Sequence, residues 1–360
     1  MFNCEKNYSC IVFIFLLASI INPVSAEPVT GKISIDSQIN VRDRSTLRTI
    51  MEGLDPEDRE NVIYLYEDGS FTANKVELID EFKKENSQNI GLDGKLKLEP
   101  NYELEGKVEE TFESVSTSAN VDFPISTYSY TNPGSQCVGD NAGPFRRVLS
   151  TKGKSRITAN IYLPSKTTSE VSIINSTEKA HIYMGASSPS GELDMGLALN
   201  YDSGTSPTNE TWGMFVKGDT NNNASFGNFK MGSEVFMKFY VVSSTSVALY
   251  VNGVNKAGES KEYTLVAGVS SSKNFNTNGT NMQVKRLTTI AQKPQQLESG
   301  SYFYNTHWYN VKVGTTSGTE VLMDSTNTAS ACGYQVENVL VNYLSQNNEY
   351  VKLKAGIPTP

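Results

Sequence analysis

The chain has 360 residues, of which 38% are hydrophobic and 19% are charged, and its formal net charge is −8. This composition indicates a folded globular protein and argues against a disordered or membrane-embedded one. The acidic balance argues against nucleic-acid binding, which needs a basic face to displace counterions. Two histidines and four cysteines leave little material for a transition-metal site.

The N-terminus is typical of a secretory signal peptide. Residues 11–21 form an uncharged apolar run that is too short to span a bilayer, and Val24 and Ala26 suit a cleavage site before Glu27. We therefore expect residues 1–26 to be removed and the mature chain to be secreted. No cysteine stands at the cleavage point and no later segment is long and apolar enough to cross a membrane, so we expect neither a lipid anchor nor a membrane span.

Cleavage would remove Cys4 and Cys10 and leave Cys137 and Cys332. An even pair of cysteines in an exported chain predicts one disulfide. Two unpaired thiols are the alternative, because the sequence does not show that the two residues lie close together.

The N-terminal part of the mature chain differs in composition from the rest. Residues 27–118 contain 21 acidic and 11 basic residues, and most of the aromatic residues follow them. We predict an acidic module at 27–98 and a linker at 99–120, with one helix after Ser45, a strand from Val62 to Tyr66 and a second helix capped by Asn74. A propeptide and a partner-docking module both suit this region.

Residues 121–360 are predicted to form a β-sandwich. Apolar runs separated by Gly, Ser, Asn and Pro clusters, with no helical pattern between them, are typical of sandwiches and barrels. The predicted strands are 156–163, 179–185, 192–200, 211–217, 234–243, 246–252, 261–267, 282–291, 301–313, 319–323 and 334–343.

Strict alternation along these strands divides core residues from outward ones. Trp212 falls on a core face, whereas Trp308 falls on the face opposite Val311 and Val313. The outward set repeats aromatic residues among charged and amide groups, which suits a sugar because a sugar ring has an apolar face and a polar rim. Cross-strand aromatic pairing that stabilises the sheet is the alternative. The predicted ligand-binding residues are Glu192, Asp194, Tyr240, Tyr250, Tyr302, Tyr304 and Trp308.

Residues 236–253 (FMKFYVVSSTSVALYVNG) resemble the paired central strands of concanavalin A-like lectins and glucanases. The chain over about 150–313 is also similar to the YrpD-like family of secreted Bacillus proteins, through RITANIYLPS, HIYMG, GELDMGLAL, TWGMFVKG and GSEVFMKFY. The resemblance implies a mainly β, concanavalin A-like jelly-roll sandwich and an extracellular location. It implies no established activity.

Glu192 and Asp194 resemble the start of the Glu-x-Asp-x-(x)-Glu strand motif of laminarinase-type glycosidases. Gly196 and Leu197 occupy the positions where the second Glu would stand, so no nearby group would protonate the leaving group. We therefore predict no catalytic residues, and a polysaccharide-cleaving enzyme (glycoside hydrolase or lyase) of the same fold is the alternative.

Asp219, Asn221 and Asn223 begin like a calcium loop, but Ala224 replaces the usual Gly and Lys230 the closing Glu. A solvated Asn-rich turn is the simpler interpretation. We predict no cofactor, although lectin-like sandwiches often hold a structural calcium ion at another turn.

The sequence thus predicts a secreted, lectin-like, non-catalytic sandwich that binds a polysaccharide or glycan at or near the cell surface. An extracellular structural or adhesion protein without a sugar ligand is a further alternative.

Overall fold

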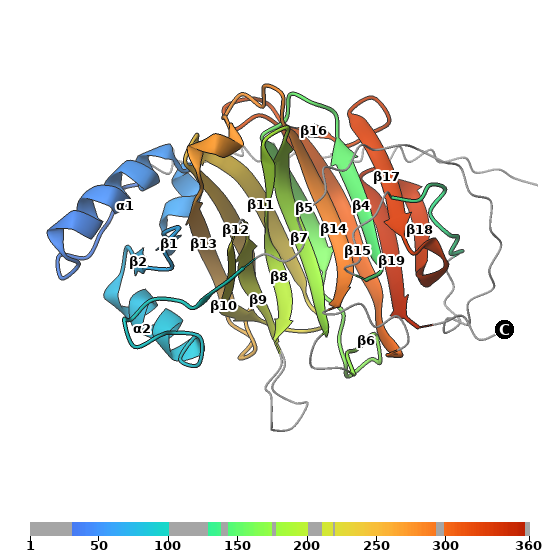
Figure 1. Ribbon diagram of the computed structural model, residues 1–360, viewed down its shortest axis with the longest axis horizontal. Helices are drawn as coiled ribbons and strands as arrows, with labels where there is room; N and C mark the ends of the chain where they lie inside the picture. The colour runs from blue at the N-terminus through green and yellow to red at the C-terminus, as the bar shows by residue number, and fades with distance from the viewer. Residues whose placement is uncertain are drawn as a thin grey trace, which may run out of the picture. The chain divides into compact units, whose positions relative to one another are not determined.

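A computed structural model describes residues 31–100, 129–137, 143–174, 178–200, 211–218, 220–292 and 299–356, which form two β-sheets (Figure 1). The predicted signal peptide and almost all of the predicted linker lie outside these residues. In hydrogen-bonded order the first sheet contains β18 (Val339–Ser345), β19 (Asn348–Ala355), β15 (Ser301–Gly314), β5 (Arg156–Tyr162), β11 (Glu234–Ser243), β12 (Ser246–Val254), β13 (Ser260–Gly268), β1 (Val62–Leu65) and β2 (Phe71–Ala73). The short strands β6 (Val171–Ser172) and β16 (Val321–Leu322) also pair with β15.

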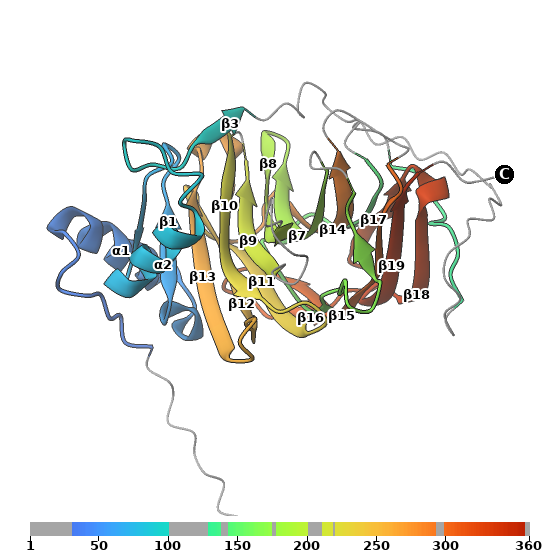
Figure 2. The ribbon, with the colours of Figure 1, turned by 90° about the horizontal axis from the view of Figure 1, so that it is seen from below.

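The second sheet contains β17 (Thr328–Tyr334), β4 (Phe145–Ser150), β14 (Gln283–Gln292), β7 (Glu178–Ser188), β8 (Gly191–Asn200), β9 (Thr211–Lys217), β10 (Thr220–Phe229) and β3 (Leu98–Pro100). The two sheets lie as layers in Figure 2, and their facing side chains form one large core cluster. The predicted mainly β, sandwich-like structure is confirmed at this level. Trp212 lies in the core, as its alternation with Met214 and Val216 predicted.

Strands that the hydrophobic pattern did not single out also join the sheets. They are β4, β17, β19 and β10, each paired with a neighbouring strand. The correction at β10 concerns the Asn-rich segment that we interpreted as a turn: backbone pairing with β9 and β3 makes it a strand despite its composition.

The acidic module is part of the sandwich and not a separate unit. Strand β1 pairs in parallel with β13, and β3 pairs with β10, so the module extends both sheets. Helix α1 (Val41–Gly53) packs on the outer face of the first sheet, and α2 (Val76–Glu85) inserts Leu78 and Phe82 into the main core. The division of the chain into a module at 27–98 and a sandwich at 121–360 is thus corrected, because apolar residues of the module complete the core of the sheets.

The caps of the two helices also differ from prediction. Asn40, and not Ser45, caps α1, since its side chain accepts a hydrogen bond from the Asp43 N–H. Asn74 does not cap α2; its amide bonds the backbone of Val62, Ser34 and the segment before β1. Short 3₁₀ helices lie at Pro56–Arg59 (η1), Ser271–Lys273 (η3) and Val336–Asn338 (η4).

Strand β15 contains two bulges that change which side chains face the core. The pairing of β15 shifts by one residue between Phe303 and Thr306, and again between Tyr309 and Lys312. Asn305 and Asn310 adopt left-handed backbone angles in these bulges, with φ of 63° and 54°, a conformation that Asn tolerates better than most residues.

Each bulge reverses the alternation, so the segment between them is inverted relative to our prediction. Trp308 is fully buried in the core, and Tyr309 lies on the outer face instead. The prediction of Trp308 as a ligand-binding residue is therefore wrong.

The disulfide between Cys137 and Cys332 is present, as predicted, with Cα atoms 5.1 Å apart. It lies on the outer face of the second sheet, where both cysteines pack with Phe145 and Leu287. The bond ties the segment before β4 to β17.

Candidate functional site

The predicted ligand-binding residues do not form one site. Glu192 and Asp194 lie on β8 of the second sheet, whereas the tyrosines lie on strands of the first sheet. The two sheets face each other across the core, so the carboxylates and the tyrosines point outward on opposite sides of the sandwich. The predicted combination of these carboxylates with Tyr304 and Trp308 around one sugar is therefore corrected.

Glu192 and Asp194 form an ion cluster with Lys285 of the neighbouring strand β14. The Lys285 ammonium group lies against the Glu192 carboxylate and 3.0 Å from Asp194 Oδ1. Burial raises the pKa of Asp194 to about 6. Burial would also raise the pKa of Glu192, but the positive charges of Lys285 and the nearby Arg147 outweigh this effect and lower it. The absence of a side chain at Gly185 admits the Asp194 carboxylate, because a Cβ there would lie 2.3 Å from Oδ1. One buried ammonium group thus compensates both carboxylates, which indicates a structural role.

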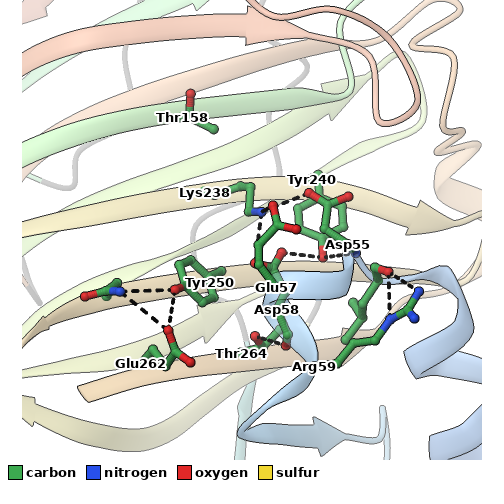
Figure 3. Close-up of polar contacts among 12 residues, drawn as sticks. Asp55, Glu57, Asp58, Arg59, Thr158, Lys238, Tyr240, Tyr250, Glu262 and Thr264 are labelled. Atoms are coloured by element: carbon green, nitrogen blue, oxygen red, sulfur yellow. Dashed lines mark hydrogen bonds and ion pairs between the residues drawn. The ribbon is translucent and has the colours of Figure 1, made fainter. Parts of the chain in front are cut away.

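Tyr240 is buried beneath η1 of the acidic module (Figure 3). Its hydroxyl donates to Asp58 Oδ2 at 2.8 Å, and Lys238 on the same strand contacts three carboxylates of the module, those of Asp55, Glu57 and Asp58. Burial raises the pKa of Asp58 to about 6, against the opposing effect of Lys238. This network joins the module to the first sheet, so Tyr240 is not available to a ligand.

Tyr250 and Tyr304 are also largely covered, and Tyr302 is half-buried. Tyr250 donates to Glu262 at 2.8 Å at the border of the module (Figure 3). Tyr302 and Tyr304 stack on each other at 4.7 Å, and the Lys352 ammonium group lies 5.9 Å from the Tyr304 ring and 4.0 Å from the ring of Tyr130. Tyr250 lies at one end of the outer face of the first sheet and Tyr302 and Tyr304 lie at the other, with a more open area between them.

The open part carries an aromatic platform, which we define as Asn160, Tyr162, Phe236, Asn252, His307, Tyr309 and Tyr350. Each of these side chains is half-buried, and together they span five adjacent strands from β19 to β12. The strand register arranges them in two rows across the sheet. The first row is Tyr350, His307, Tyr162 and the exposed Glu234, and the second is Tyr309, Asn160, Phe236 and Asn252.

Three rings of the platform stack on one another. The His307 ring lies 3.8 Å from the ring of Tyr350 and 4.7 Å from that of Tyr309, in nearly parallel planes. Burial lowers the pKa of His307, so the imidazole is neutral at pH 7, and its Nε2 lies 2.9 Å from Asn348 Oδ1. Burial and the nearby Glu234 carboxylate raise the pKa of Tyr309 to about 12.

The amide of Asn160 has no hydrogen-bond partner within the described part of the chain. It lies between Tyr309 and Phe236 in the second row. A half-buried amide between two aromatic side chains can donate to and accept from a polar ligand without breaking an internal bond. Asn252, at the end of the row, already donates to the Tyr250 hydroxyl at 3.2 Å.

None of the seven platform residues was among the predicted ligand-binding residues, and sequence reasoning had particular cause to miss His307, Tyr309 and Tyr350. The first two were hidden by the bulges, and the third lies in a strand that the hydrophobic pattern did not reveal. Asparagines within an aromatic strand, here Asn305 and Asn310, were the available signal, because Asn is enriched at left-handed positions.

A second feature is a groove of about 580 Å³ at the edge of the first sheet. Tyr64 and Tyr66 of the module line it, together with Asp43 and an ion pair between Asp68 and Lys95. The Tyr66 hydroxyl bonds Asp43 at 3.3 Å, so much of the polar lining is internally paired.

The described residues contain no group of three or more His, Cys, Asp or Glu side chains arranged to hold a metal ion. Within the same residues, no helix has the length and apolar character needed to cross a membrane.

Comparison with known proteins assigns no family. No protein-family model and no curated protein matches the chain. Among solved structures, the chain is similar to scytalido-glutamic peptidase with a transition-state analogue inhibitor, at 12% identity and a TM-score of 0.36, over 58% of this chain and 97% of that one. SCP-B, a member of the eqolisin family of peptidases, matches at 11% identity and a TM-score of 0.34 over the same shares. A protein of unknown function from Shewanella oneidensis MR-1 matches at 12% identity and a TM-score of 0.21, over 65% of this chain and 78% of that one. Likenesses at these TM-scores carry no conclusion about fold or activity.

Proposed function

We propose that this protein binds carbohydrate, without cleaving it, through the aromatic platform on the outer face of the first sheet. The observation that carries the proposal is the mixture of half-exposed rings and amides, Tyr309, Asn160, Phe236 and Asn252, in one row of adjacent strands. Aromatic rings bind the apolar face of a sugar, while amides bind its hydroxyl groups.

The surroundings of the platform favour a ligand over simple sheet stabilisation. The stack of His307 on Tyr350 is a cross-strand pair of the stabilising kind. Such pairing does not require an unbonded amide beside the rings, yet Asn160 offers one. A sugar hydroxyl would satisfy this amide better than an apolar cover would.

We retain three predictions from the sequence as part of this proposal. They are a concanavalin A-like jelly-roll fold, a relationship to the YrpD-like family, and secretion to a location at or near the cell surface. The Cys137–Cys332 disulfide supports an oxidising compartment, since such bonds are rare in reducing ones.

Co-sedimentation with insoluble polysaccharides and affinity electrophoresis in soluble ones would test the proposal. We expect the wild-type protein to bind at least one polysaccharide and Tyr309→Ala to bind it about tenfold more weakly, the loss typical of an interface anchor. Tyr343→Ala is the matched control, because Tyr343 is exposed on β18, outside the platform.

A reducing-end assay on each bound polysaccharide separates binding from cleavage. Binding without product supports the proposal, and release of reducing ends would replace it by the glycoside hydrolase alternative. Binding of no polysaccharide would overturn it and favour a structural or adhesion role.

A further inference from the structure

The dimensions of the platform define the form of the glycan. Resting on the proposed function, we infer that the ligand is an extended and uncharged glycan that lies across the strands and engages about four sugar rings.

The length follows from the strand order. The platform begins at Tyr350 on β19 and ends at Asn252 on β12, with β15, β5 and β11 between them. These four interstrand steps cover about 19 Å at the usual spacing of 4.7–4.9 Å. About four pyranose rings of an extended chain fill this distance.

The direction follows from the covered ends of the face. Along β11, the next outward residue after Phe236 is Lys238, which is buried under η1 by its contacts with Asp55 and Asp58. In the other direction, the strands end at Glu234 on β11 and Tyr162 on β5. On β5 and β11, where Thr158 and Lys238 are buried, the open band is thus two outward residues deep, about 7 Å between its rows, so a chain of several sugars fits across these strands and not along them.

The second row alternates in chemistry along the inferred direction. Tyr309, Asn160, Phe236 and Asn252 stand on consecutive strands, so an aromatic side chain recurs at every second strand. In an extended β-linked chain successive sugars present opposite faces. A ring at every second position therefore meets the same face of alternate sugars, while the amides between them meet the hydroxyl groups.

The charge around the platform indicates an uncharged ligand. Glu234 ends the first row, and Glu262 lies beside Asn252 at the end of the second. Both side chains are acidic, and no basic side chain of the described residues lies in the two rows; Lys312 stands in the neighbouring row, opposite Thr158. A polyuronate would be repelled by the two carboxylates.

Isothermal titration of the full mature chain with oligosaccharides of increasing length tests this inference. The probes are β-1,4-linked glucose and N-acetylglucosamine oligomers of two to six units, with maltohexaose and oligogalacturonate for comparison. We expect the affinity for one β-linked series to rise at each step up to about four units and to level off beyond that. Maltohexaose, which is curved, and oligogalacturonate should bind at least tenfold more weakly.

Variants at the row locate the ligand. Phe236→Ala should reduce the affinity for the tetramer about tenfold, to near that for the dimer, while Tyr343→Ala leaves the length dependence unchanged. Thermal melts of each variant verify that it is folded.

A plateau at two units, or equal binding of curved or acidic oligomers, would overturn the inferred ligand while leaving carbohydrate binding intact. Failure of every oligomer and polymer to bind would instead refute the proposed function itself.

Discussion

Replacing Trp308 by alanine is expected to lower the free energy of unfolding by about 3–5 kcal/mol, the usual cost of truncating a buried aromatic side chain. The structure supports this magnitude because the Trp308 side chain is 0% exposed. Its indole Nε1 donates to Thr288 Oγ1 at 2.9 Å, and the buried Arg286 guanidinium lies 5.5 Å from the ring. The substitution would leave a cavity and remove two polar interactions at once.

Urea unfolding followed by circular dichroism measures this loss. Trp308→Phe is the matched variant, because it keeps most of the ring and loses the hydrogen bond to Thr288, for an expected cost of about 1–2 kcal/mol. The native emission of both tryptophans should be blue-shifted and resistant to acrylamide, since Trp212 is equally buried. Glycan affinity should not change in any variant that remains folded.

The opposite result would refute the face assignment. If Trp308→Ala keeps its stability and loses glycan affinity, Trp308 faces outward and the bulges at Asn305 and Asn310 are misplaced. Tyr309 would then lie in the core, and the platform as defined would not exist.

Three further predictions concern the module and the disulfide. Burial raises the pKa of Asp58 to about 6 and that of Glu85 to about 7, so the folded state holds protons that the unfolded state has released. The stability contributed by these groups should therefore fall as the pH rises from about 4 to about 7, and Asp58→Asn should flatten this part of a urea-unfolding pH series. Replacing Cys137 and Cys332 by alanine should cost up to about 5 kcal/mol on the chain-entropy estimate for so long a loop, and an unchanged unfolding midpoint would count against a formed disulfide. Limited proteolysis should cut first between about 100 and 125, and the nicked fragments should stay associated on gel filtration because β1 pairs with β13; separation of the fragments would show that the module is independent.

Local patterning was sufficient to predict many of the strands. In β8, β11 and β12 the apolar residues alternate, and the core faces that follow from this alternation match the buried residues. Alternation holds there because each strand lies between two regularly paired neighbours and has one face on the core. The cysteine pair was equally informative, since only two cysteines remain after the predicted cleavage.

The candidate site was less accessible to sequence reasoning. Tyr240 has the outward position that alternation predicts, yet η1 covers it through contacts that come from about 180 residues earlier in the chain. The residues near Tyr240 in sequence give no indication that η1 buries its side chain. The separation of Glu192 from the tyrosines likewise depends on which sheet each strand joins.

Sequence by itself determined the mainly β class, the core faces of the regular strands and the disulfide pair, because these depend on the periodicity and composition of short segments. Tertiary structure decided which outward residues are open. Two bulges in β15 exchanged Trp308 for Tyr309, and long-range pairing placed the module over one end of the face while leaving the platform uncovered. A bulge inserts one extra residue, so the side chains that follow it point to the opposite face of the sheet until the next bulge. This exchange can be recognised only when the register with the neighbouring strands is known.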